Sequence, residues 1–194
     1  MNWPNTHVLI NHFPIILTIM GAAAVVVALL LRSRKVWLYG VASLTLAGLT
    51  AYPAVWTGTR AEEALEHAWY VQERAIHTHE EAAELTMWIL LAMGAVAAFA
   101  WWRTERADER TLPGGRRPPP LWLRVVVLLF ALAGAGTVTW TSLLGGRIIH
   151  ESPIIRGPRP AGVPAPVERA RPGATAPSGA APAPSGAAQP GAAP

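Results

Sequence analysis

The sequence contains no cysteine and few charged residues for its length. Of its 194 residues, 14% are charged and 52% are hydrophobic. Without cysteine the chain cannot form a disulfide, a thiolate metal site, a c-type haem attachment or a cysteine nucleophile. Any metal or cofactor ligand must therefore come from histidine, methionine, a carboxylate or the backbone. The scarcity of charge also argues against a soluble enzyme.

Sequence motifs of common enzyme classes are absent as well. The chain has no H-E-x-x-H, no G-x-S-x-G and no phosphate-binding P-loop. It also lacks the Glu-x-x-His pairs of di-iron bundles, so the glutamates near its centre are interpreted as the solvated face of an amphipathic helix. The net charge of +4 comes from arginines spread over loops and tail. This distribution, without a basic aromatic surface element, argues against a nucleic-acid partner.

Four long apolar stretches predict an all-α fold, a polytopic four-helix bundle embedded in a lipid bilayer. They cover about 8–31, 36–56, 82–102 and 121–144, and crossing a bilayer core takes about 20 residues. Lysine and arginine gather between the first two stretches and between the last two. The positive-inside rule then places both termini outside the cytoplasm.

The predicted domain organisation is a membrane domain over 1–151 followed by a tail over 152–194. An acidic helical segment, 60–81, leads into the third stretch. The tail is rich in proline, alanine and glycine and has too few large apolar residues to offset the entropy of ordering it. We expect it to be disordered and extracytoplasmic, and we place no chemistry in it.

All six histidines fall on the same predicted side of the membrane. They are His7, His12, His67, His77, His79 and His150. Antiparallel helices would bring the start of the first span, the start of the third and the end of the fourth to one face. Residues far apart in the sequence could therefore form one site there, although six residues on two sides can also fall together by chance.

Helical geometry separates the candidates. His79 shares a face with small residues suited to close packing, so we expect it to point into the bundle. His12 lies inside an apolar run, where a polar side chain needs a partner, and His150 lies on a polar, small face if the fourth helix continues past two glycines. His77 and Glu80 are weaker metal candidates on a more polar face. His7 and His67 are predicted to be interfacial or solvated.

The residues also suggest a family. The run from His7 to Ile15, H-V-L-I-N-H-F-P-I, resembles the opening of the DUF2231 family of small bacterial four-helix membrane proteins. Thr57-Gly58, His79-Glu80 and Gly145-Gly146 followed by His150 are similar to the later landmarks of that family. The resemblance implies the bacterial cytoplasmic membrane as location. It also implies a redox context with cytochrome c-type or other membrane redox partners, and it marks His12, His79 and His150.

Three functional hypotheses remain open at this point. The first is a redox protein that binds b-type haem or a metal, with His12 and His79 as the axial pair and His150 as an alternative ligand. The second is a non-catalytic membrane scaffold or accessory subunit, in which the histidines bond between helices. The third, a small transporter or channel, has less support, because no acidic ring or pair of broken helices is present.

Overall fold

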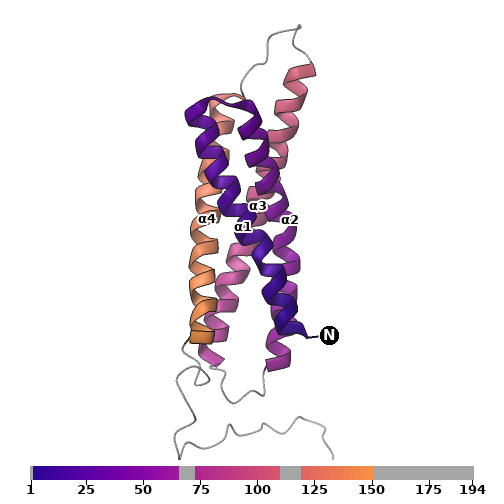
Figure 1. Cartoon of the computed structure of the whole chain (residues 1–194), viewed down its shortest axis with the longest axis vertical. Helices are drawn as coiled ribbons and strands as arrows, with labels where there is room; N and C mark the ends of the chain where they lie inside the picture. Colours follow the sequence, from indigo (N-terminus) through magenta and orange to yellow (C-terminus); the bar gives the residue numbers. More distant parts are fainter. Residues whose placement is uncertain (1, 66–72, 110–118, 151–194) are drawn as a thin grey trace, which may run out of the picture. The chain divides into compact units, whose positions relative to one another are not determined.

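Four long helices make up the described part of the chain (Figure 1). The computed structural model describes residues 2–65, 73–109 and 119–150, and its helices are α1 (Trp3–Leu31), α2 (Arg34–Leu65), α3 (Glu73–Glu109) and α4 (Leu121–His150). Each helix includes one of the predicted apolar stretches and is long and apolar enough to cross a membrane. The predicted tail and the middle of the predicted acidic segment lie outside the described residues.

The helices form an antiparallel bundle in chain order. α1 and α3 each pack against both α2 and α4, so that α1 and α3 lie diagonally opposite each other. We call the end of the bundle where α1 and α3 begin, and where α2 and α4 end, the N-terminal end; Figure 1 shows it at the bottom. The opposite end holds the tight connection from α1 to α2.

Local sequence signals at its two ends explain where α1 begins and where it stops. The side chain of Asn2 caps the first turn by accepting a hydrogen bond from the backbone N–H of Asn5, and a proline occupies the first turn. At the other end, Arg32 adopts a left-handed conformation with φ 50°, and its N–H donates to the carbonyl of Ala28. Only two residues then separate α1 from α2, which forces the two helices to run antiparallel.

Glycines set the closest approaches between helices. A Cβ atom on Gly48 of α2 would lie 2.8 Å from a backbone carbonyl of α3 and 2.9 Å from the Cα of Gly94. Gly21 and Gly40 allow a similar approach of α1 to α2. Small residues let membrane helices come close enough for extensive van der Waals contact. The bundle is therefore tight along its middle.

The end opposite the N-terminal end has a core of large apolar side chains and specific polar links. Trp37 is buried and donates its indole N–H to the hydroxyl of Thr104, at 3.2 Å. Arg34 and Glu105 form an ion pair at 3.0 Å, which also joins α2 to α3. The fully buried Leu44 and Leu123 belong to the same apolar core.

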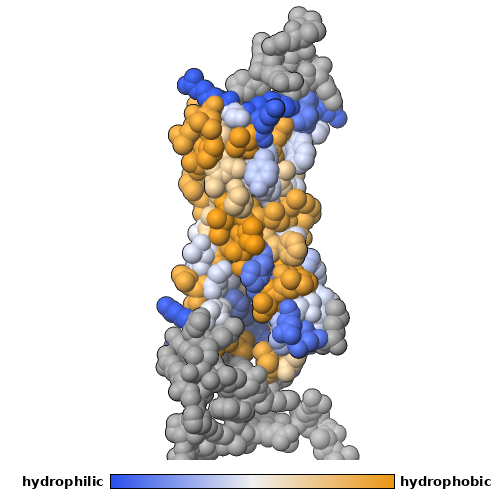
Figure 2. Space-filling view, viewed as in Figure 1, coloured by the Kyte–Doolittle hydropathy of each residue, from blue (hydrophilic) through white to orange (hydrophobic). Residues whose placement is uncertain are grey.

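The outer surface is apolar over most of the length of the helices. Figure 2 shows hydrophobic residues over much of the visible face, with hydrophilic ones gathered at its top and others in its middle and lower part. Leu30 and Leu49 are 77% and 67% exposed, and large apolar side chains are exposed on all four helices. Exposing such an apolar surface to water is unfavourable, whereas the lipid interior of a membrane accommodates it without this cost in free energy.

Candidate functional site

His7 joins α1 to α2 at the N-terminal end. Its ring is half-buried, and Nδ1 lies 3.1 Å from the backbone carbonyl oxygen of Ala54 and 3.4 Å from the hydroxyl of Thr57. Gly58, one turn after Ala54, leaves room for the ring, since a Cβ there would be 3.1 Å from Cε1 of His7. His7 is therefore partly buried between α1 and α2 and not solvated, while its predicted interfacial position stays a prediction.

His79 joins α3 to α4 at the same end. Its ring is also half-buried, and Nδ1 lies 3.1 Å from the backbone carbonyl oxygen of Thr141. A Cβ on Gly145 would be 2.9 Å from Cε1 of His79. The predicted orientation of His79 into the bundle is confirmed by these contacts.

The two contacts repeat the same local arrangement. In each helical hairpin, a histidine near the start of the first helix approaches a backbone carbonyl of the second, and its ring packs on the glycine four residues further along. The pairs are Ala54 with Gly58 on α2 and Thr141 with Gly145 on α4. His7 therefore lies in the interface between α1 and α2, and His79 lies in the interface between α3 and α4.

The hydrogen bonds fix how each ring presents its second nitrogen. A backbone carbonyl can only accept, so Nδ1 carries the proton in both neutral rings and Nε2 has a free lone pair. Within the described residues, no hydrogen bond involves Nε2 of His7 or His79. A histidine that ligates a metal commonly has this arrangement, in which a carbonyl holds one nitrogen and orients the other.

The interior around the two rings is built from small and polar side chains. Its buried residues in the described part of the bundle are Ala54, Thr57, Ala61, Ala82 and Thr86. The hydroxyls of Thr86 and Thr141 are 2.7 Å apart, and Thr141 also donates to the carbonyl of Ala82. The large buried side chains, such as Leu44 and Met93, belong to other parts of the core.

The other histidines that the sequence singled out lie elsewhere. His12 is exposed on α1, where Nδ1 bonds to the carbonyl of Val8 in its own helix and the ring borders a shallow, open groove. His77 and Glu80 are exposed, and His77 pairs with Glu81 one turn on, at 3.5 Å, as its face predicted. α4 does continue to His150, but the side chain of that residue lies outside the described part.

The structure thus places His7 and His79 at the same end of the bundle, each between two helices, and leaves His12 on the outer surface. Across the described residues, no three or more histidine, aspartate or glutamate side chains gather at one point. A signal for His7 was present in the sequence. His7 is in heptad register with three residues of α1 that are buried, namely Pro14, Thr18 and Gly21. His12 lies about 140° around the helix from His7 at 3.6 residues per turn, and therefore on a different face.

Comparisons with known proteins do not assign the chain to a family or a function. The resemblance to the DUF2231 family rests on short motifs, and it stays a prediction. The geometry of the histidines must therefore support any statement about function. No protein-family model matches the chain, and neither do any of the curated proteins or solved structures with which it was compared.

Proposed function

We propose that this chain is an integral membrane protein of a respiratory or other redox context that binds a b-type haem or a transition-metal ion through His7 and His79. The observation that supports it is the pair of imidazoles at the N-terminal end, each held by a backbone carbonyl through Nδ1. Two neutral imidazoles on different helices are the usual axial ligands of a b-type haem. The same two donors suit several transition metals.

The residues present fit such a group in their donor chemistry. Each Nε2 has a lone pair with no competing hydrogen bond among the described residues, and each ring is oriented by a neighbouring helix. A bound iron or other metal would supply a centre that accepts these lone pairs. The chain itself contributes orientation, because Gly58 and Gly145 let both rings lie against helix backbones.

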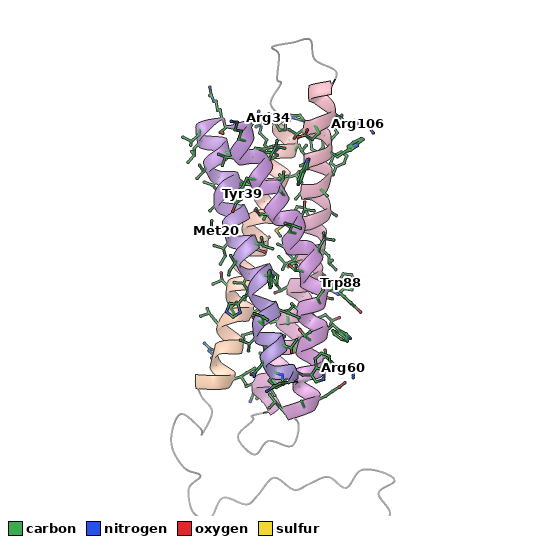
Figure 3. All side chains as sticks on the ribbon, turned by 45° about the vertical axis from the view of Figure 1, so that its right-hand side comes forward. Met20, Arg34, Tyr39, Arg60, Trp88 and Arg106 are labelled. Carbon is green, nitrogen blue, oxygen red and sulfur yellow. The ribbon has the colours of Figure 1, made fainter. Side chains whose placement is uncertain are left out.

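The proposed location is the bacterial cytoplasmic membrane, with the N-terminal end and both termini on the extracytoplasmic side. Figure 3 labels Arg34 and Arg106 at the end opposite the N-terminal end, where Arg103 and Lys35 also lie. Clusters of basic residues near span ends favour the cytoplasmic side. Membership of the DUF2231 family, an extracytoplasmic tail and cytochrome c-type or other membrane redox partners are part of the same proposal.

The test is a reduced-minus-oxidised absorption spectrum of the detergent-purified chain, with a pyridine haemochrome assay and elemental analysis on the same sample. We expect a stoichiometric haem or metal in the wild type that is lost in His7→Ala and in His79→Ala. His77→Ala is the matched control, since His77 is exposed two residues from His79. A colourless, metal-free protein from cells supplied with haem and metals would refute the proposal.

A second function is favoured by one specific observation. Each ring already joins two helices through a hydrogen bond and packs on a glycine, which is what a purely structural histidine would do. In that case the chain is a non-catalytic scaffold or accessory subunit. Such a subunit would bind no cofactor, and the only effect of alanine at position 7 or 79 would be a lower stability of the bundle.

A further inference from the structure

The end of the bundle opposite the N-terminal end carries exposed basic side chains, and Figure 3 labels two of its arginines. The exposed ones among the described residues are Arg32, Lys35, Arg103 and Arg106. We propose that this end binds the phosphate group of an anionic phospholipid, and that Arg124 at the start of α4 is the residue that contacts it. This inference goes beyond the proposed function and does not depend on it.

Arg124 lies partly inside the bundle although it is charged. It belongs to the first turn of α4 and is in heptad register with Ala131 and Val138, which are buried. Its side chain is partly buried, and Nε is buried without a hydrogen-bond partner. In the part of the chain that the structure describes, Arg124 has no ion pair either.

Arg34 shows how the chain itself can neutralise an arginine at this end. It lies in the first turn of α2, and its Nη2 forms an ion pair with the carboxylate of Glu105 at 3.0 Å. The first turn of α4 contains no acidic residue. Because a buried guanidinium nitrogen without a hydrogen bond is unfavourable, an anion from outside the chain would stabilise Arg124.

The depth of Arg124 favours a lipid phosphate as this anion. Trp122, two residues earlier, is 55% exposed, and tryptophan at the end of a span is typical of the headgroup level of a bilayer. A guanidinium binds a phosphate through two parallel hydrogen bonds. The exposed apolar residues Val125, Leu129 and Leu132 follow on α4 and offer a surface along which acyl chains can lie.

The charge around Arg124 favours an anionic lipid over a zwitterionic one. Basic residues outnumber acidic ones in the segments 32–35 and 103–124, which contain the helix ends of this side. Clusters of lysine and arginine beside a membrane attract anionic lipids. A zwitterionic lipid brings its own cationic group to the same place and therefore loses part of this attraction.

The test measures lipid binding to the full chain in detergent by native mass spectrometry. Phosphatidylglycerol is the anionic probe, and phosphatidylcholine with the same acyl chains is the zwitterionic one. Arg124→Gln removes the charge and keeps a polar side chain. Arg106→Gln is the matched control, because it removes the same charge at the same end from an exposed side chain that already lies over Trp102. Circular dichroism checks that each variant is folded.

We expect the wild type to bind phosphatidylglycerol more tightly than phosphatidylcholine. Arg124→Gln should weaken the binding of phosphatidylglycerol by about tenfold or more, and Arg106→Gln by less than about threefold. Arg124→Lys, which keeps the charge without the planar guanidinium, should retain part of the affinity and provides the comparison if Arg124→Gln does not fold.

Three results would overturn the inference. Equal weakening in Arg124→Gln and Arg106→Gln would mean that only the overall charge of this end attracts the lipid. Equal binding of the two lipids by the wild type would mean that the site does not select an anionic headgroup. Displacement of phosphatidylglycerol by an excess of inorganic phosphate would mean that the site recognises a free anion and not a lipid.

Discussion

A methyl group added at Gly145 tests whether the glycines hold the histidine rings in place. In Gly145→Ala the new Cβ would lie 2.9 Å from Cε1 of His79, 3.3 Å from Nδ1 and 3.4 Å from Nε2. One whole edge of the imidazole is in the way, so the ring must move. The same movement breaks the hydrogen bond from Nδ1 to the carbonyl of Thr141, which is 3.1 Å long.

The expected loss of stability combines three contributions. Overpacking of a well-filled interior costs about 1–3 kcal/mol, and a lost hydrogen bond costs about 0.5–1.5 kcal/mol. Alanine recovers about 0.8–1 kcal/mol through its higher helix propensity. We therefore expect Gly145→Ala to lower the free energy of unfolding by about 0.5–3.7 kcal/mol, and to weaken the binding of any ligand that His79 holds.

Gly136→Ala is the matched control on the same helix. A Cβ at Gly136 meets nothing within 4 Å, so this variant should be as stable as the wild type or slightly more stable. Gly58→Ala should lie between the two, since its Cβ would be 3.1 Å from His7. Unfolding by SDS in mixed micelles, followed by circular dichroism, measures all three. If Gly145→Ala were as stable as Gly136→Ala, the argument that glycine makes room for the ring would fail.

Three further substitutions test the core by the same unfolding assay. Gly48→Ala should destabilise by about 1–3 kcal/mol, because its Cβ would meet the backbone at Gly94 at 2.9 Å, where no side chain can move aside; an unchanged midpoint would contradict this close approach. Trp37→Phe should cost at least about 1 kcal/mol through loss of the buried bond to Thr104, and a neutral result would mean that the bond contributes nothing. Thr18→Val should stabilise by about 1 kcal/mol, because the hydroxyl of Thr18 is fully buried without a partner among the described residues; destabilisation would indicate that a bound molecule satisfies it.

The fold was predictable because it depends on long apolar stretches, of which the chain has four. Each apolar stretch is long enough to identify its helix without reference to the others, and a helix that crosses a bilayer must satisfy its own backbone groups. Short connections then make neighbouring helices antiparallel. His79 was also predictable, because α3 has small residues on one face and glutamates on another near that position.

The site was only half predictable, because its contacts join residues far apart in the chain. The bond from His7 to Ala54 spans 47 positions and the bond from His79 to Thr141 spans 62. Such contacts depend on how each helix is rotated and on its register against its neighbour. α1 is apolar on almost every side, so its pattern does not mark an inward face. Depth in the membrane and the family resemblance both favoured His12 over His7. The small residues Pro14 and Gly21, in register with His7, were the better guide.

The orientation of the bundle can be tested directly, because the chain has no cysteine and each introduced thiol is the only one present. Ala64 is exposed at the N-terminal end and Lys35 is exposed at the opposite end. We expect a membrane-impermeant maleimide to label Ala64→Cys in intact bacterial cells and Lys35→Cys only after permeabilisation. The reverse pattern would invert the proposed topology, and labelling of both from one side would show that α2 does not cross the membrane. The result also bears on the histidine pair, because the side on which Ala64 is labelled is the compartment from which a metal ion would reach His7 and His79.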